Sequence, residues 1–271
     1  MMILRTVAEV REALAGPRSH GRIGLVPTMG ALHEGHVSLI RAARAECDTV
    51  VVTLFVNPAQ FGDPADLQAY PRDERHDASV AEDAGADFLF APSVDQIYGS
   101  GHATWVEVQG AADGLEGEHR PGHFRGVATV CLKLFLITAP QRAYFGQKDA
   151  QQVAVVSQMV QDLNVDLVIR VMPIVRAADG LALSSRNARL SPDERTRALA
   201  IPRAIAAGVA AFKGGGDPVA AARAQLAALD VDYVAVASFN GQPTLVIAAR
   251  VGRTRLIDNA RLDQAGDVDG R

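Results

Sequence analysis

Long uncharged apolar stretches are missing from this sequence, and so is any excess of positive charge. No segment approaches the ~18 uncharged apolar residues that a membrane span needs. The formal net charge is -4, which gives no general electrostatic case for binding nucleic acid. We therefore expect neither a membrane nor a nucleic acid as a partner.

Cysteine is also scarce. The 271 residues contain two cysteines, Cys47 and Cys131, which lie far apart and in apolar surroundings. This usage is typical of a reduced protein with structural thiols and not of a disulfide-rich secreted one. The opening residues MMILRTVAEVREAL mix charges with apolar side chains, which favours an amphipathic helix over a signal peptide. We expect a cytoplasmic protein.

Two common catalytic signatures are absent as well. The sequence contains neither a GxxxxGK[ST] phosphate loop nor an H-E-x-x-H zinc motif. It has instead the run PTMGALHEGH, residues 27–36, between a strand predicted at Ile23–Val26 and a helix predicted at Val37–Ala45. In a parallel sheet such a turn lies at the carboxyl end of a strand, where ligands bind.

The residue types in this turn favour a phosphate ligand. Gly30 and Gly35 let the backbone approach a ligand closely, and the start of a helix attracts an anion. His33 and His36 can donate hydrogen bonds to phosphate oxygens. The same two histidines are compatible with a metal ion, but no cysteine or clear third ligand lies nearby. We predict a phosphate site and no metal held by protein side chains.

Two further turns carry polar residues at strand ends. NPAQFG, residues 57–62, follows the strand predicted at 49–56, and the amide of Gln60 fits either a turn cap or a contact with a small polar substrate. Lys148 comes shortly after Gly146, where another strand passes into a helix. A cation at that place favours contact with phosphate.

Two segments are open to alternative interpretations. Ser184 and Ser185 are consistent with simple helix capping, whereas together with Arg186 they also suit a polyphosphate. LEGEHRPGHFRG, residues 115–126, combines histidines, arginines and glycines without periodicity. It fits either a solvated loop or a segment that covers a substrate. Just before it, residues 104–108 are expected to form a short strand.

The order of the predicted elements favours an α/β fold. Apolar β-branched runs such as TVVVTLFV, residues 49–56, are typical of parallel strands buried on both faces. The pattern later changes to Ala-rich helices followed by three strands. We expect a Rossmann-like parallel-sheet domain over residues 1–176. A smaller α+β domain should occupy residues 177–271 and end in a disordered tail from residue 262.

Four separated blocks of this sequence resemble the pantothenate synthetases, the pantoate–β-alanine ligases of the H-x-G-H nucleotidylyltransferase superfamily. The blocks are PTMGALHEGH, NPAQFG, FGQKDAQQ and LSSRN, and the resemblance extends over almost the whole chain. It implies the ATP-dependent condensation of pantoate with β-alanine through a pantoyl adenylate, with release of pyrophosphate and AMP. It also implies Mg²⁺ with the ATP and a homodimer.

The resemblance implies roles for individual residues. The second histidine of the first block, here His36, is the proton donor, and His33, Lys148 and Arg186 join it in stabilising phosphate charge.

Two glutamines are implied as substrate contacts. Gln60 would bind pantoate beside the β-alanine position, and Gln152 would bind pantoate. The implied ATP contacts are Met29, Gly30, Ala31, Leu32, His33, Glu34, Gly35, His36, Gly146, Gln147, Lys148, Asp149, Val175, Leu183, Ser184, Ser185 and Arg186.

The chain departs from the family pattern at three positions. Gln147 stands where Glu is usual, Ala150 where Tyr is usual and Leu183 where Met is usual. None of these changes removes a group to which chemistry is assigned. Two alternative functions remain open on the sequence: another H-x-G-H nucleotidylyltransferase, and a nucleotide-binding sensor without activity.

Overall fold

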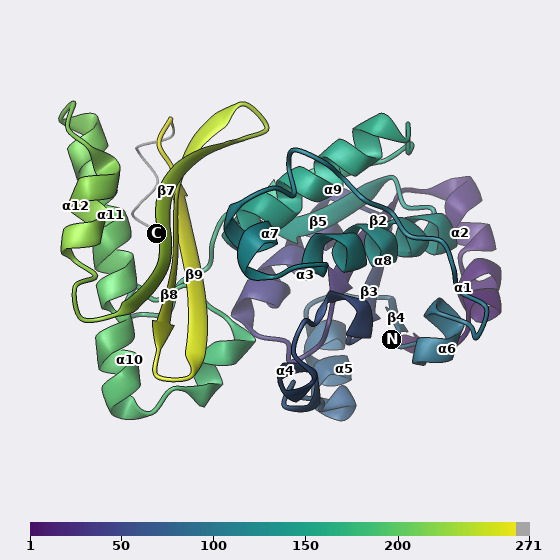
Figure 1. Ribbon diagram of the computed structural model, residues 1–271. Coiled ribbons are helices and arrows are strands. Elements are labelled where there is room, and N and C mark those ends of the chain that lie inside the picture. The colour runs from purple at the N-terminus through teal and green to yellow at the C-terminus, as the bar shows by residue number, and fades with distance from the viewer. Residues whose placement is uncertain (264–271) are drawn as a thin grey trace. The chain divides into compact units, whose positions relative to one another are not determined.

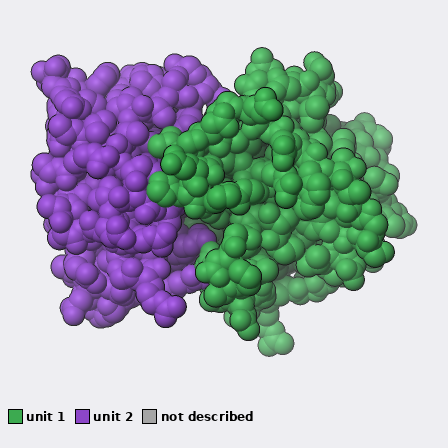
Figure 2. Space-filling view, in the orientation of Figure 1, with its two compact units in different colours: residues 1–146, 151–172 green, residues 147–150, 173–271 purple. Residues whose placement is uncertain are grey.

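The structure, a computed structural model, describes residues 1–263 (Figure 1). They fold as two compact units, which Figure 2 distinguishes by colour. The first unit consists of residues 1–146 and 151–172, and the second of residues 147–150 and 173 onward. The second unit thus includes a short segment that interrupts the first in sequence. Most of the predicted tail lies outside the described residues.

The first unit is built on a six-stranded sheet whose neighbouring strands are all parallel. The strands, in spatial order, are β1 (Met2–Leu4), β4 (Phe88–Phe90), β3 (Thr49–Leu54), β2 (Ile23–Thr28), β5 (Arg142–Gly146) and β6 (Val168–Met172). The chain leaves β2 towards β3 and returns on the other side of β2 as β5. The topological switch therefore lies between β2 and β5, where α/β sheets bind ligands. The predicted Rossmann-like fold is confirmed.

Alternate residues of the strands pack into two apolar clusters, one on each face of the sheet. Leu25 and Val51 belong to one cluster, and Val26 and Val52 belong to the other. The first cluster includes residues of α1 (Val7–Ala13), α8 (His123–Thr138) and α9 (Ala150–Asp162), and the second includes residues of α3 (Glu34–Glu46) and α5 (Glu74–Asp83). Because both faces are covered, the central strands β2 and β3 are mostly apolar.

The remaining helical elements of the first unit are short. They are α2 (Ala15–His20), α4 (Pro64–Gln68), α6 (Val94–Ile97), α7 (Leu115–His119) and the 3₁₀ turn η1 (Pro58–Gln60). No helix of the described chain is long and apolar enough to cross a bilayer.

One local prediction for this unit is correct only in part, and another is wrong. The N-terminus does not begin with a helix, because residues 2–4 pair with β4 as an edge strand. The helix α1 starts only after Thr6, whose hydroxyl accepts a hydrogen bond from the N–H of Glu9. Residues 104–108 form no strand. The N–H of Val106 instead donates to the hydroxyl of Thr129 at 3.0 Å.

The second unit is a three-stranded antiparallel sheet with helices. Its elements are η2 (Gln147–Asp149), η3 (Ser185–Arg189), α10 (Pro192–Ala198), α11 (Ala200–Lys213), α12 (Pro218–Ala224), β7 (Asp230–Phe239), β8 (Gln242–Val251) and β9 (Thr254–Arg261). Asn240 and Gly241 both have positive φ (51° and 77°), as a two-residue hairpin of type I′ requires. Ile205 of α11 and Leu245 of β8 are buried in one cluster. The smaller α+β portion is confirmed.

Glu46, the last residue of α3, joins that helix to the sheet. Its carboxylate accepts hydrogen bonds from Arg170 at 2.7 Å, from the hydroxyl of Tyr144 at 2.9 Å and from Arg142. The guanidinium of Arg170, with the Tyr144 hydroxyl and Arg142, lowers the pKa of Glu46 to about 2. Glu46 is therefore ionised at neutral pH, and it stabilises the contact of α3 with β5 and β6.

We expect Glu46→Gln to lower the free energy of unfolding by about 1–3 kcal/mol at neutral pH, because charged hydrogen bonds are lost. A carboxylate whose pKa is lowered in the folded protein stabilises the fold at pH values above its pKa in the unfolded chain, which is about 4.3. This stabilisation is lost as the pH falls towards the lowered pKa. The difference in free energy of unfolding between the variant and the native protein, measured with urea, should therefore shrink from about pH 5 downward. Glu12→Gln, at an exposed residue, is the control. A difference that stays constant with pH would contradict the assignment.

Candidate active site

The turn after β2 is fixed by a buried carboxylate from α5. Asp77 is 1 % exposed and accepts hydrogen bonds from the N–H groups of Ala31 (2.9 Å) and Leu32 (2.7 Å). Gly30 and Ala31 both lie in the left-handed region, with φ of 87° and 52°. A Cβ on Gly30 would lie 2.5 Å from the side chain of Leu54. The N–H groups of Ala31 and Leu32 therefore bind Asp77 within the protein.

The two histidines are oriented by the start of α3. His33 is the N-cap, and its Nδ1 accepts a hydrogen bond from the N–H of Gly35 at 3.1 Å. The Nδ1 of His36 accepts from the N–H of His33 at 3.3 Å. An Nδ1 that accepts a hydrogen bond leaves the proton of a neutral imidazole on Nε2. Both rings therefore present an Nε2–H donor.

Gly35 has a steric role between the two rings. A Cβ at this position would lie 2.8 Å from Cε1 of His33, so a larger residue would push the ring away from the helix. The ring centroids of His33 and His36 are 4.2 Å apart. Glycine in the H-x-G-H pattern thus permits the two imidazoles to lie together.

The donors at this turn suit an anion. Among residues 1–263 no three His, Cys, Asp or Glu side chains are grouped as a metal site would need. The two Nε2–H groups lie at the end of β2, beside the topological switch of the sheet. Such a place suits the phosphates of a nucleotide.

Gln60 lies at the end of η1, after β3, and is 7 % exposed. Asn57 caps η1 by accepting from the N–H of Ala59 at 3.2 Å. The Nδ2 of Asn57 donates to Oε1 of Gln60 at 2.9 Å. The capping role weighed from the sequence therefore belongs to Asn57, and the amide of Gln60 is held by that cap.

Residues 115–126 are not a solvated loop. They contain α7 and the start of α8, which follows Gly122 in the left-handed conformation (φ 79°). His123 is buried, and both nitrogens of its ring have a partner. Nε2 lies 3.0 Å from Nη1 of Arg120, and Nδ1 lies 2.9 Å from the carbonyl oxygen of Gln60. Because arginine only donates, Nδ1–H of His123 donates to Gln60. This segment therefore positions η1.

Close backbone packing reinforces that contact. A Cβ at Gly126 of α8 would lie 2.3 Å from the carbonyl oxygen of Ala59. The carbonyl of Gly126 also accepts from Nδ2 of Asn57 at 3.1 Å. The start of α8 can lie against η1 only because residue 126 has no side chain.

The two neighbouring glutamines of α9 have different environments. Gln151 is buried, and its amide nitrogen donates to the carbonyls of Ala111, Asp113 and Gly114 at 3.1–3.2 Å. Its oxygen accepts from the N–H of Glu116. Gln152 is partly exposed, and its side chain makes no hydrogen bond within the described residues. Gln151 therefore has a structural role, and the amide of Gln152 stays available to a ligand.

In the second unit, the turn that carries Lys148 is bound to β9. Asn259 of β9 donates from Nδ2 to the carbonyls of Gln147 (3.0 Å) and Lys148 (2.9 Å). The side chain of Gln147 donates back to Oδ1 of Asn259 at 3.3 Å. The neighbouring Asp258 is buried and paired with Arg176 at 2.7 Å. Adjacent polar residues directly after the apolar pair Leu256 and Ile257 are the signal by which the sequence could have indicated Asp258 and Asn259.

The predicted contacts around residue 184 form a compact group of their own. The N–H of Leu183 donates to the carbonyl of Val175 at 3.0 Å. The hydroxyl of Ser184 accepts from the N–H of Arg186 at 3.3 Å and caps η3. The capping interpretation of Ser184 is therefore confirmed, and Val175, Leu183 and Arg186 come together through these bonds.

The predicted site residues divide between the two units. The first unit contains Met29–His36, Gln60, Gly146 and Gln152, and the second contains Gln147–Asp149, Val175 and Leu183–Arg186.

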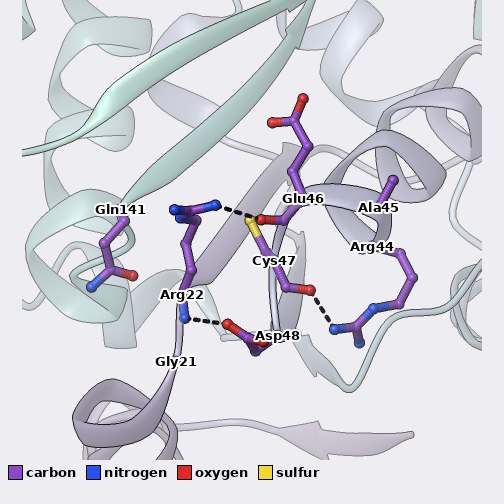
Figure 3. A pocket seen from close by; sticks show the side chains of 8 residues that line it. All are labelled: Gly21, Arg22, Arg44, Ala45, Glu46, Cys47, Asp48 and Gln141. Carbon is purple, nitrogen blue, oxygen red and sulfur yellow. Dashed lines mark hydrogen bonds between the residues drawn. The ribbon is translucent and has the colours of Figure 1, made fainter.

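A separate cavity of about 740 Å³ lies at the opposite, amino-terminal edge of the sheet. Its lining includes Arg22, Asp48 and Gln141, which lie just before β2, β3 and β5 respectively, and Arg44, which lies near the end of α3 (Figure 3). The N–H of Arg22 donates to Asp48 at 2.7 Å, and Gln141 accepts from the first N–H of β2. These groups hold the strand ends together, so the cavity has no part in the predicted site.

Comparisons with known proteins agree with this geometry. The family model described as pantoate-beta-alanine ligase matches residues 2–261. Pantothenate synthetase of Cereibacter sphaeroides is 50% identical over 273 residues, covering 95% of this chain and 98% of that protein. The enzyme of the same name from Moorella thermoacetica is 48% identical, covering 97% and 99%.

Solved structures give the same result. A crystal structure of pantothenate synthetase from Thermus thermophilus matches with a TM-score of 0.92 and 44% identity, covering 97% of this chain and 99% of that one. A pantoate-beta-alanine ligase from Francisella tularensis, crystallised with beta-gamma ATP and beta-alanine, matches with a TM-score of 0.85 and 35% identity, covering 97% and 98%.

Proposed function

The chain belongs to the pantoate–β-alanine ligase family, and from this premise we propose how its residues carry out the reaction. The enzyme joins pantoate to β-alanine and forms pantothenate. ATP is consumed in the first of two steps, in which it reacts with pantoate. The full-length match to the family supports this activity. It gives no support to the alternatives of another H-x-G-H nucleotidylyltransferase or an inactive sensor.

The reaction proceeds in two transfers. A carboxylate oxygen of pantoate forms a bond to the α-phosphorus of ATP, and the bond from that phosphorus to the bridging oxygen breaks, which releases pyrophosphate. The amine of β-alanine then attacks the acyl carbon of pantoyl adenylate. The amide bond forms, the amine loses a proton, and AMP leaves with its oxygen. No enzyme nucleophile is needed, because a carboxylate is ionised at neutral pH.

The observation that carries this proposal is that Nδ1 of both His33 and His36 accepts a backbone N–H at the turn after β2, which assigns the proton of each neutral ring to Nε2. Negative charge grows on the phosphate oxygens as pyrophosphate departs. Fixed N–H donors stabilise that charge without having to reorient during the reaction. His36 is the donor to the departing oxygen in this mechanism, and His33 supports the phosphates.

We assign pantoate to Gln60 and Gln152, and β-alanine to the neighbourhood of Gln60. Gln60 is buried and its amide is held in place by Asn57. Gln152 has an amide without a partner among the described residues. Such amides suit the hydroxyls and the carboxylate of pantoate.

The cationic residues of the second unit are assigned to ATP. Lys148 follows Gly146 on a turn whose carbonyls at residues 147 and 148 accept hydrogen bonds from Asn259. These bonds fix the backbone from which the Lys148 side chain extends. Arg186 provides a guanidinium suited to phosphate oxygens. The remaining proposed ATP contacts are Met29, Gly30, Ala31, Leu32, Glu34, Gly35, Gly146, Gln147, Asp149, Val175, Leu183, Ser184 and Ser185.

Magnesium is proposed to enter with the nucleotide. The imidazole, ammonium and guanidinium groups that we assign to the phosphates are hydrogen-bond donors and poor ligands for Mg²⁺. In this proposal Mg²⁺ would be carried by ATP and would neutralise part of the charge of its phosphates. We place the enzyme in the cytoplasm because its two cysteines are buried free thiols and because it consumes ATP.

One assay tests the activity directly. AMP should form from ATP only when both pantoate and β-alanine are present, and pyrophosphate should form with pantoate alone in single turnover. AMP formation that does not depend on β-alanine would contradict the ligase assignment.

We expect His36→Ala and His33→Ala each to slow pyrophosphate release by about 10²-fold or more, the usual effect of losing a transition-state donor. Gly35→Ala should slow it as well, because the added Cβ displaces the His33 ring. Gly16→Ala, in a place where a Cβ meets nothing within 4 Å, is the matched control. Rapid-quench measurement of pyrophosphate, with melting curves, checks this. Normal rates in folded histidine variants would remove both rings from the mechanism.

We also propose a homodimer that forms through β6. This strand pairs only with β5 among the described strands, so its other edge is open. Val168 and Val171 are 56 % and 40 % exposed, and Leu163 just before the strand is also exposed. An open apolar edge is suited to pairing with another strand, and a second copy of the chain supplies an identical one.

Sedimentation should give a mass near twice the 28.7 kDa of the chain. Val168→Lys combined with Val171→Lys should produce monomers, since four added positive charges would then lie along the shared edge. Val236→Lys, at a similarly exposed valine of β7, should remain a dimer. A monomeric native protein, or a dimeric double variant, would overturn this interface.

A further inference from the structure

Two backbone groups determine which end of the Asn57 side-chain amide is the oxygen and which is the nitrogen. Its Oδ1 accepts from the N–H of Ala59 at 3.2 Å, and its Nδ2 donates to the carbonyl of Gly126 at 3.1 Å. A backbone N–H can only donate and a backbone carbonyl can only accept. The amide of Asn57 therefore has one possible orientation.

This orientation passes to Gln60. The Nδ2 of Asn57 also donates to the Gln60 side chain at 2.9 Å, so the atom of Gln60 that faces Asn57 must be the acceptor, Oε1. The amide nitrogen of Gln60 then points the other way. It makes no hydrogen bond within the described residues, although the side chain as a whole is buried. Gln60 thus presents two N–H donors to a ligand.

Tyr98 completes the set of bonds. Its hydroxyl donates to Oδ1 of Asn57 at 2.8 Å, the oxygen that already accepts from Ala59. Burial raises the pKa of Tyr98 to about 12, so the hydroxyl carries its proton at neutral pH and can donate. Tyr98 is the C-cap of α6 and lies in a segment far from β3 in sequence.

We propose that Tyr98 is a positioning residue for pantoate: its O–H···Asn57···Gln60 chain holds the Gln60 amide with the nitrogen towards the substrate. The proposal rests on the assignment of Gln60 to pantoate. It makes the site selective for ligands that offer hydrogen-bond acceptors at this point, such as hydroxyl or carboxylate oxygens. Without the Tyr98 hydroxyl, the oxygen of Asn57 retains only the longer bond from Ala59 at 3.2 Å, so the Asn57 amide keeps its orientation but is held less tightly, and the Gln60 amide bound to it moves more.

The ring of Tyr98 is packed independently of its hydroxyl. It lies 6.2 Å from the ring of Phe55, 4.9 Å from His102 and 6.0 Å from Trp105. Trp105 is the single tryptophan of the chain, so its fluorescence reports on this aromatic group. Tyr98→Phe retains the ring contacts and removes the hydroxyl alone.

The expected result for Tyr98→Phe is a rise of about 5- to 10-fold in KM for pantoate, the usual scale for one lost hydrogen bond. KM for ATP and kcat should change by less than about 2-fold, and the Trp105 emission should be unchanged. Tyr144→Phe is the matched control. It removes another buried tyrosine hydroxyl, one bound to Glu46 at the opposite edge of the same sheet, and should leave KM for pantoate unaltered.

A double-mutant cycle with Gln60→Ala separates the two assignments. If Tyr98 acts through Gln60, Tyr98→Phe should add nothing to the pantoate KM once Gln60 is alanine. Equal effects in both backgrounds, or an unchanged KM in Tyr98→Phe alone, would overturn the positioning role and leave Gln60 as a pantoate contact. A normal pantoate KM in Gln60→Ala would instead overturn the assignment of Gln60, and the role of Tyr98 with it.

Discussion

The arrangement of the first unit's site depends on one buried carboxylate. Asp77 of α5 receives the N–H groups of Ala31 and Leu32, and so determines the path by which the chain leaves β2. Because that path ends at His33, the start of α3 and the orientation of both imidazoles follow from it. The carboxylate of Asp77 is thereby bound by backbone N–H groups of the turn itself.

The sequence was most informative where a pattern repeats. The run TVVVTL predicted a strand buried on both faces, and β3 occupies Thr49–Leu54 because helices cover both sides of the sheet. The three C-terminal strands were predicted in the same way. The H-x-G-H turn was placed at a strand-to-helix junction, and the family that it resembles is confirmed over nearly the whole chain.

Elements without periodicity were missed for identifiable reasons. The short α7 is held by Gln151, a residue more than thirty positions away whose amide binds three carbonyls, and no local pattern encodes that contact. Histidine is an uncommon N-cap, so the role of His33 as cap and donor could not be read from propensity. Asp77 on a polar helix looks like a surface charge until its two backbone partners are seen.

The segment 147–150 has a consequence for the modularity of the chain. It belongs by packing to the second unit, although residues 151–172 return to the first. A fragment that begins at residue 173 would lack the carbonyls of Gln147 and Lys148, and the buried amide of Asn259 would lose both acceptors. Each unpaired donor of this kind costs about 1–3 kcal/mol, a large share of the stability of a small domain. The C-terminal portion is therefore not a self-contained folding module that recombination could transfer by a single cut.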